Sequence, residues 1–359
     1  MRNMPILLIV NVGSTSTKIA LFKGTESVVQ DTITYNADEL SGYASLHDQL
    51  PRRRDDLEQF VGKNNISLMV VDLFISRGGL GKPGPAGAYA VDQIMCQDLL
   101  AGKYGRHPSA LGPAMMLHLA EKYGKRAIIV DPPSTDEFDP LARISGMPEI
   151  ERRSAFHALN QKAAARRMAR SVGRAYEELK LVVAHLGGGI TIGAHRNGCV
   201  VDCTHGLTEG PFTPERAGTL PTQDLIDLTR SETLDRKQLQ LRLVGRGGLA
   251  AYLGTTDAKE VEAMILQGDE KARFIYQAMA YQIAKDIGAM RVALKGSADG
   301  IVLTGGLARS EMLTGWIRDW VEGLASVFVY PGEDEMTALA EGGLRVLSGE
   351  EPVRPYHNG

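Results

Sequence analysis

The stretch Ile9-Val10-Asn11-Val12-Gly13-Ser14-Thr15-Ser16-Thr17-Lys18 decides how this chain is expected to fold. A β-rich apolar run over 7–10 leads into a turn of glycine and hydroxyl residues, and the strand pattern resumes over 18–22 before Gly24. This predicts a hairpin with a hydroxyl-rich loop. Further strands are predicted over 28–34 and within the apolar run 68–76, which two glycines end.

The same pattern returns in the second half of the chain. Residues 182–194 read as a strand, a turn of three glycines and another strand. A pattern repeated after about half the chain length predicts two similarly built domains, although two unrelated hairpins would look alike because hairpins are common. Four identities share the offset of 174 residues: Gly13 with Gly187, Thr17 with Thr191, Ala20 with Ala194 and Gly24 with Gly198.

Helices are predicted between these hairpins, over 153–171, 272–292 and 337–347. A third glycine turn, over 304–307, follows an expected strand at 300–303. Strand hairpins followed by helices indicate an α/β protein with mixed sheets. Prolines lead up to Ile150, where we place the domain boundary. Without a low-complexity linker, the two domains are expected to pack together with a cleft between them.

Composition limits the classes of function. The chain has 359 residues, 43% hydrophobic and 23% charged, and a net charge of −3. The basic run Arg52–Arg54 is followed at once by Asp55 and Asp56, so no nucleic-acid or membrane patch is predicted. No apolar run reaches the roughly 18 residues of a membrane helix, and no export signal is evident, so we expect a cytoplasmic protein. Three cysteines are expected to stay reduced.

The glycine turns favour phosphate binding. Backbone N–H groups and hydroxyls without side-chain bulk suit phosphate oxygens, and Lys18 adds a positive charge after the first turn. Three such turns, each after an apolar strand, are stronger evidence for nucleotide binding than a single turn would be. The sequence lacks a Walker A motif, because Pro83 follows Gly81-Lys82. The run 245–250 fits a dinucleotide fingerprint only without its distal acidic residue.

At these turns and at several longer blocks, the sequence resembles the butyrate kinases of the acetokinase family, within the sugar kinase, heat-shock chaperone and actin superfamily. The match runs in order along nearly the whole chain, and Asn11 stands where most of the superfamily has Asp. Val12 departs from the usual Pro, and Cys203-Thr204-His205-Gly206 departs from a usual Asn-Asn-Ala. The matching blocks are 11–18, 77–80, 130–132, 142–152, 156–162, 184–189 and 210–221.

The resemblance implies two domains of the actin-like ATPase (ribonuclease H-like) fold. It implies an acid-binding domain of residues 1–150 completed by the C-terminal segment 337–359, and a nucleotide-binding domain of residues 151–336. It also implies reversible, ATP-dependent phosphorylation of butyrate or another short-chain carboxylic acid to an acyl phosphate and ADP, with Mg²⁺, in a homodimer or higher homo-oligomer. An acetate, propionate or branched-chain acid kinase is the alternative enzyme; a nucleotide-dependent switch or filament protein on the same fold would not need acid-binding arginines.

The same resemblance assigns roles to individual residues. Arg77 would bind the carboxylate, Arg216 would stabilise the transition state, and His157 would donate a hydrogen bond to the transferring phosphoryl group. Glu335 would bind Mg²⁺, with Asn11 and Asp131 near the metal; a shifted alignment would exchange Glu335 with Asp334 or Glu333. His107 also matches a family histidine, with a structural role as the alternative. The nucleotide contacts carried over are Ser14, Ser16, Lys18, His185, Gly187, Gly188, Gly189, Asp257, Lys259, Gly305, Gly306 and Arg309.

Overall fold

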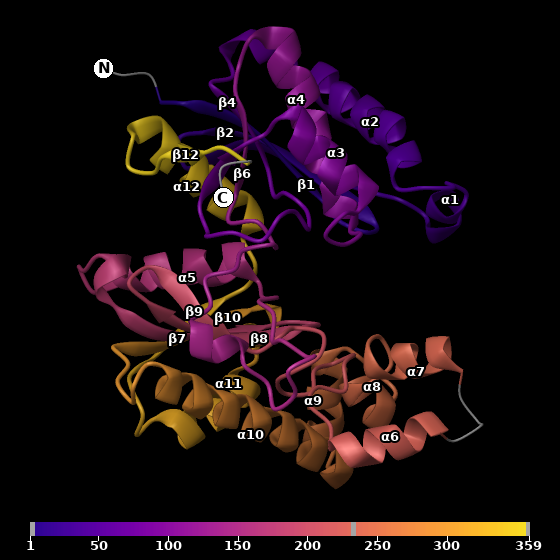
Figure 1. Ribbon diagram of the computed structural model, residues 1–359, viewed down its shortest axis with the longest axis vertical. Coiled ribbons are helices and arrows are strands. Elements are labelled where there is room, and N and C mark those ends of the chain that lie inside the picture. The colour runs from indigo at the N-terminus through magenta and orange to yellow at the C-terminus, as the bar shows by residue number, and fades with distance from the viewer. Residues whose placement is uncertain (1–3, 231–234, 357–359) are drawn as a thin grey trace. The chain divides into compact units, whose positions relative to one another are not determined.

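The computed structural model describes residues 4–230 and 235–356. The chain divides into two compact units (Figure 1): Met1–Thr135 with Asp334–Gly359, here the first unit, and Asp136–Glu333, the second unit. The change-over at residue 135 precedes the boundary expected near Ile150. The reason is that the segment after it pairs with the second sheet, where the Asp139 N–H donates to the Val201 carbonyl. Of the expected C-terminal segment, residues 357–359 lie outside the described residues.

The sheet of the first unit has the order β12-β5-β6-β4-β1-β2-β3. Strands β1, β2 and β3 form an antiparallel meander, and β1, β4 and β6 run parallel. The short strand β5 pairs antiparallel with β6, and β12 pairs parallel with β5. The strands are β1 Ile6–Val12, β2 Ser16–Lys23, β3 Glu26–Thr34, β4 Leu73–Ser76, β5 Ala88–Ala90, β6 Ala127–Val130 and β12 Val353–Arg354.

Helices cover both faces of this sheet, which explains why β1 is a continuous apolar run. Leu8 and Val10 belong to the core shared with α2, α3 and α4. On the opposite face α12 approaches so closely that a Cβ on its Gly343 would lie 2.3 Å from a methyl of Ile75. The helices are α1 Ala37–Ser41, α2 Leu50–Lys63, α3 Gln93–Ala101, α4 Leu111–Tyr123 and α12 Glu335–Ser348.

The second unit has the sheet order β11-β10-β7-β8-β9. Val182 and Ala184 of β7 pack against α10 and α11, whereas Leu181 and Val183 pack against α5. Its strands are β7 Lys180–Leu186, β8 Ile190–Arg196, β9 Cys199–Cys203, β10 Gly300–Gly305 and β11 Val327–Pro331. Its helices are α5 Ala158–Ser171, α6 Thr222–Arg230, α7 Arg236–Leu243, α8 Gly248–Leu253, α9 Ala258–Leu266, α10 Glu270–Ala293 and α11 Glu311–Val321.

The two sheets repeat one topology. Strands β3-β2-β1-β4-β6 of the first unit have the same order and directions as β9-β8-β7-β10-β11 of the second. The span of β1, 6–12, falls on the span of β7, 180–186, at the offset of 174 found in the sequence. The chain is therefore a structural duplication.

The offset of 174 residues relates β1 to β7, but it is one residue too large for the second strands, β2 and β8. Val12 pairs with Thr17 across a four-residue loop, whereas Leu186 pairs with Ile190 across the three glycines. Because side chains alternate along a strand, this one-residue difference changes which residues correspond. Thr191 therefore corresponds to Lys18, not to Thr17.

Two expected elements differ in extent. The helix expected from residue 153 begins at Ala158, because Arg152 is held in the preceding segment by Asp202 and Glu209, and the His157 N–H is directed to Thr191 Oγ1. The run 68–76 divides into a 3-10 turn, Leu68–Val70, and β4.

No helix in the described part of the chain is both long and apolar enough to cross a membrane. The other 3-10 turns are His47–Gln49, Pro108–Ala110, Pro140–Arg143, Tyr176–Glu178 and Gly306–Arg309.

Candidate active site

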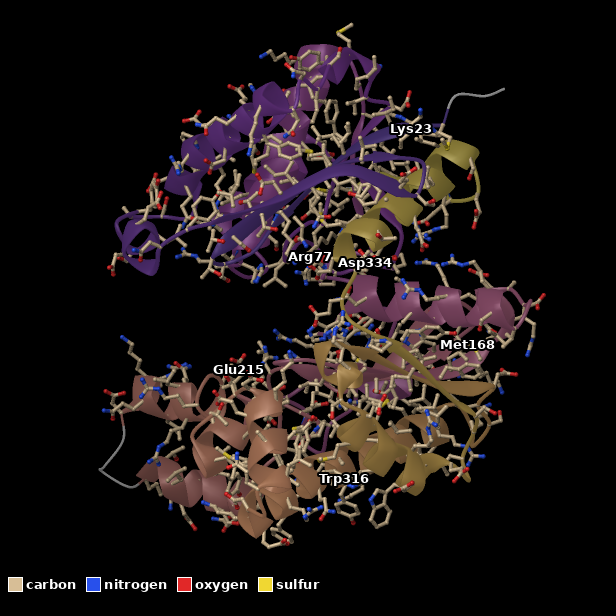
Figure 2. The ribbon with its side chains drawn as sticks, turned by 180° about the vertical axis from the view of Figure 1, so that it is seen from behind. Lys23, Arg77, Met168, Glu215, Trp316 and Asp334 are labelled. Atoms are coloured by element: carbon tan, nitrogen blue, oxygen red, sulfur yellow. The ribbon has the colours of Figure 1, made fainter. Side chains whose placement is uncertain are left out.

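Four predicted site residues of the first unit are linked to one another; we call Asn11, Arg77, His107 and Glu335 the first-unit cluster. Asn11 is the last residue but one of β1, Arg77 follows β4 directly, and Glu335 begins α12. The Asn11 amide donates to Glu335 Oε2 over 2.5 Å, and Arg77 lies 3.1 Å from Glu335 Oε1. Figure 2 shows Arg77 beside Asp334, the residue before α12. Strand order thus brings three distant sequence segments to one carboxylate.

His107 is coupled to the same charges. Burial lowers the pKa of His107, the nearby Arg77 guanidinium lowers it further, and Glu335 opposes the shift. Its Nδ1 lies 2.8 Å from Ser109 Oγ and accepts from the Ser109 N–H at the start of a 3-10 turn. His107 therefore caps its own loop and also faces the cluster's charges.

Three consecutive acidic residues have three different partners. Glu333 lies 3.0 Å from His185 Nε2, Asp334 accepts from the Thr337 N–H as the N-cap of α12, and Glu335 contacts Asn11 and Arg77. The sequence left open which of these three acidic residues lies near Asn11. The contacts show that it is Glu335.

Asp131 sits in a strained turn after β6, at a φ of 41°. Its carboxylate accepts from the Gly87 N–H over 2.9 Å, and its own N–H donates to the Gly87 carbonyl. Left-handed backbone at a non-glycine residue is costly and persists only when its surroundings hold it. This exchange of hydrogen bonds holds the turn, and a catalytic role of Asp131 near the metal stays a prediction.

The turn of residues 13–16, which carries Ser14 and Ser16, rests on a buried arginine from the basic run 52–54. Arg53 has no exposed surface. It donates to the Ser16 carbonyl over 3.1 Å and to Thr17 Oγ1 over 2.7 Å, and its guanidinium lies 4.2 Å from the Tyr35 ring centroid. The helical period of α2 turns Arg53 inward, while Arg52 on the same helix stays half exposed.

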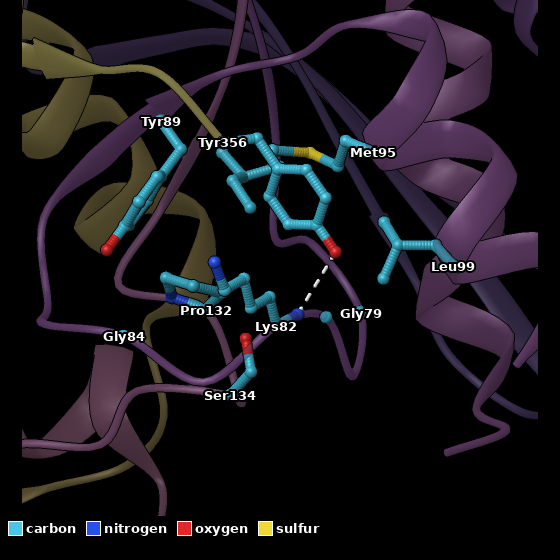
Figure 3. Close-up of a pocket in the computed structure, with 11 residues that line it drawn as sticks. Gly79, Lys82, Gly84, Tyr89, Met95, Leu99, Pro132, Ser134 and Tyr356 are labelled. Carbon is cyan, nitrogen blue, oxygen red and sulfur yellow. Dashed lines mark hydrogen bonds between the residues drawn. The ribbon is translucent and has the colours of Figure 1, made fainter. Parts of the chain in front are cut away.

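The loop after Arg77 is anchored by the C-terminal segment (Figure 3). The Tyr356 hydroxyl accepts from the Lys82 N–H over 3.0 Å and donates to Asp98. The cavity left around it, lined among others by Gly79 and Leu99, is about 10 Å³. That volume holds about one water molecule, so this cavity is too small for a four-carbon acid.

A second group of predicted residues meets in the second unit; His157, His185, Thr191 and Arg216 form the second-unit cluster. The His157 and His185 rings stack with centroids 3.9 Å apart and an interplanar angle of 21°. His157 Nδ1 lies 2.8 Å from Thr191 Oγ1. The sequence repeat includes Thr191 but assigns it no role, and its pairing with His185 across β7 and β8 places it in this cluster.

Arg216 lies against the three-glycine turn. Its guanidinium donates to the Gly206 carbonyl, and a Cβ on Gly189 would lie 2.3 Å from its NH1 atom. Thr213 Oγ1 donates to the Gly188 carbonyl over 2.6 Å, which ties the Arg216 loop to the turn. Burial lowers the pKa of the Arg216 guanidinium, against the opposing effect of Glu215. The segment 203–206, which differs from the usual family pattern, therefore contributes Gly206 to the site.

The third glycine turn lies beside the three-glycine turn. A Cβ on Gly305 would lie 2.3 Å from the Leu186 carbonyl, so only glycine allows the two backbones to approach this closely. Gly306 begins the following 3-10 turn, and the Arg309 guanidinium lies against Gly332.

The remaining predicted nucleotide contacts have other positions. Asp257 is the N-cap of α9, where its carboxylate accepts from the Lys259 N–H over 2.8 Å. Ser14, Ser16 and Lys18 belong to the first unit, unlike the other nucleotide contacts. The predicted nucleotide set is thus divided between the two units.

The donor set of the first-unit cluster suits a sparsely held Mg²⁺. Within residues 4–230 and 235–356, no group of three or more His, Cys, Asp or Glu side chains is arranged to hold a metal ion. Mg²⁺, however, commonly takes one or two protein carboxylates and completes its shell with water and phosphate oxygens. Glu335, with the Asn11 side chain beside it, fits that requirement.

The duplicated sheets and glycine turns are those of the actin-like ATPase fold, and comparisons with known proteins identify the class within it as a kinase. Residues 148–337 match the model of the acetokinase family. Butyrate kinase 2 of Clostridium acetobutylicum is 44% identical over 98% of this chain and 99% of its own length. The chain therefore belongs to the acetokinase family.

Solved structures show the same fold. The acetate kinase of Porphyromonas gingivalis superposes with a TM-score of 0.76 at 18% identity, over 96% of this chain and 100% of that one. A propionate kinase from Francisella tularensis gives a TM-score of 0.74 at 16% identity, over 94% and 99% of the two chains.

Proposed function

We propose that this kinase transfers the γ-phosphoryl group of ATP to the carboxylate of butyrate, giving butyryl phosphate and ADP, reversibly. The observation that carries the proposal is the 44% identity to Butyrate kinase 2 over nearly the full length of both chains, and the two clusters of predicted site residues support it. Acetate, propionate and branched-chain acids are the alternative substrates, because one methylene changes discrimination by only about 1–3 kcal/mol.

The chemistry fits the residues present. A carboxylate is ionised at pH 7, so its oxygen can attack the γ-phosphorus without a general base. The new O–P bond forms as the bond from the γ-phosphorus to the bridging oxygen breaks, and ADP leaves with that electron pair. The need is therefore for groups that hold negative charge in position.

We assign these needs to the two clusters. Arg77 is one-quarter exposed and would bind the butyrate carboxylate. Arg216 and a ring N–H of His157 would stabilise the transferring phosphoryl group, and the N–H groups of the three-glycine turn would hold ATP phosphates. Glu335 and Asn11 would hold Mg²⁺, which when bound neutralises phosphate charge.

The test is a chain-length series with purified enzyme, in which hydroxylamine traps the acyl phosphate. The proposal is supported if kcat/KM is highest for butyrate. A preference for acetate or a branched acid would assign a different substrate. If ADP release does not depend on any of the acids, the proposed activity is overturned.

Two variants test the division between the arginines. Arg216→Ala should mainly lower kcat, because an arginine acting on a transferring phosphate can be worth about 10³–10⁵-fold in rate. Arg77→Ala should raise KM for butyrate at least as much as it lowers kcat. Lysine at either position should rescue only in part, because it lacks the planar guanidinium fork. Equal kcat losses with unchanged KM would contradict the assignment of Arg77.

We also propose that the enzyme works in the cytoplasm as a homodimer or higher homo-oligomer. Support for the compartment comes from the sequence, whose three cysteines are too few for a disulfide scaffold. Sedimentation of the purified chain tests the assembly, and a monomer at assay concentration would contradict it.

A further inference from the structure

We propose that a buried relay of Thr191, Gln161, His195 and Tyr176 positions His157 and fixes its neutral ring with the hydrogen on Nε2. The inference rests on the proposed function, in which His157 donates a hydrogen bond to the transferring phosphoryl group. A neutral imidazole carries one ring hydrogen, so the tautomer decides which edge of the ring can donate.

The backbone sets the orientation of Gln161. This side chain projects from α5 and is fully buried. One end of its amide lies 3.0 Å from the Thr191 carbonyl and 2.9 Å from Thr191 Oγ1. A carbonyl oxygen can only accept, so the end facing Thr191 must be the NH₂ group. The amide oxygen therefore faces the opposite way, toward His195.

The Thr191 hydroxyl then has one remaining direction for its hydrogen. Its oxygen accepts from the Gln161 amide and from the His157 backbone N–H. The remaining contact is His157 Nδ1, at 2.8 Å. The hydroxyl donates there, Nδ1 accepts, and the ring hydrogen of neutral His157 lies on Nε2.

The far end of the relay is consistent with this direction. His195 is fully buried, and burial together with the charges of Lys162 and Arg166 lowers its pKa well below the usual value. Its Nε2–H donates to the Gln161 amide oxygen over 3.0 Å. Its Nδ1 accepts from the Tyr176 hydroxyl over 2.8 Å. His195, Gln161 and Thr191 thus each accept from the preceding group of the relay and donate to the next.

The ring of His157 is also held in its plane. Its edge is fixed by Thr191, and its face is stacked on His185, whose Nε2 lies 3.0 Å from Glu333. Mutating the partners that orient a metal-bound histidine typically costs about 10–100-fold in metal affinity or activity. By analogy, we expect a loss of that size when the partners of His157 are removed.

The decisive measurement is the tautomer itself. The chain has 8 histidines. ¹⁵N-histidine labelling, with the His157 signals assigned through His157→Gln, reports which ring nitrogen carries the hydrogen at a pH above the titration of His157. We expect an unprotonated Nδ1 and a protonated Nε2 in the wild-type enzyme. Hydrogen on Nδ1 would overturn the relay, and this result is read from the wild-type enzyme, with a variant used only to assign its signals.

Kinetics test the consequence. Thr191→Val keeps the shape but removes the hydroxyl, so the tautomers should mix and kcat should fall about 10–100-fold with KM values changed less than about 3-fold. Thr191→Ser should retain kcat within about 3-fold. Thr314→Val, which removes another buried hydroxyl of the same unit, should leave both kcat and the His157 signals unchanged.

The outcomes separate the two claims. An unchanged His157 spectrum in Thr191→Val would overturn the relay. The expected spectral change with normal kcat in both Thr191→Val and His157→Gln would instead overturn the proposed role of His157 in the transfer.

Discussion

A single methyl group at Gly189 should disable the kinase by moving Arg216. A Cβ built at Gly189 lies 2.3, 2.6 and 2.9 Å from the NH1, Cζ and NH2 atoms of Arg216. At Gly188 the nearest atom, Glu215 Oε1, is 3.7 Å away. Gly189 is not among the glycines with positive φ, so alanine fits its backbone.

The size of the effect follows from these distances. Ordinary contacts to a Cβ lie at 3.4–4 Å, so the guanidinium must shift by about 1 Å. Because it ends a flexible side chain, it can swing away while the fold persists. A displacement of about 1 Å of a catalytic group can cost about 100-fold, or about 2.7 kcal/mol of transition-state stabilisation. We expect Gly189→Ala to lower kcat by about that factor, with KM values changed less than about 3-fold.

Hydroxamate-coupled steady-state kinetics measure this loss. Gly315→Ala is the matched control of near-normal kcat, because a Cβ at this position of α11 would meet no atom within 4 Å. If the methyl acts through Arg216, adding Gly189→Ala to Arg216→Ala should cost nothing further. Near-wild-type kcat for Gly189→Ala, or an additive loss in the double variant, would refute the reasoning.

Three further predictions concern the metal, the nucleotide and the fold. Glu335→Gln should raise the Mg²⁺ concentration for half-maximal activity about 10-fold or more, whereas Asp334→Asn, which keeps a good helix cap, should leave that titration unchanged; equal titrations would remove Glu335 as the ligand. Gly188→Val should raise KM for ATP by crowding the approach of phosphates to the turn, and normal ATP binding by calorimetry would make the turn structural only. Arg53→Met leaves the Ser16 carbonyl and Thr17 Oγ1 without their charged donor, so it should lower the stability of the first unit by about 3–5 kcal/mol in urea unfolding followed by hydrogen exchange at β1 and β2. The half-exposed Arg52→Met should cost under about 1 kcal/mol, and similar losses in the two variants would contradict the buried network.

The strand pattern was predictable because it is local. Apolar runs ended by glycine place β1 and β7, and the offset of 174 relates their bounds. The one-residue difference between the two hairpin loops was not visible, because glycine tolerates several loop lengths equally well. It took the cross-strand pairing to show that Thr191, beside His185, occupies the place of Lys18 beside Asn11.

The site residues were predictable as types and positions, since Arg77 and Arg216 stand in glycine-flanked loops and Glu335 stands near a helix start. Their partners were not. The sequence alone could not separate Glu335 from its acidic neighbours, because residues adjacent in a chain differ in direction, and only the packing of α12 decides which one meets Asn11.

Burial of polar groups was the property that only tertiary structure decided. By itself the sequence determined a duplicated α/β chain with phosphate-binding turns and a set of charged residues suited to acyl phosphate chemistry. It did not distinguish Arg53 from its solvated neighbours, nor Gln161 and His195 from ordinary helix and strand residues. A buried donor or acceptor must find its partner across the fold, and those partners come from segments distant in sequence, such as Tyr35 for Arg53 and Tyr176 for His195.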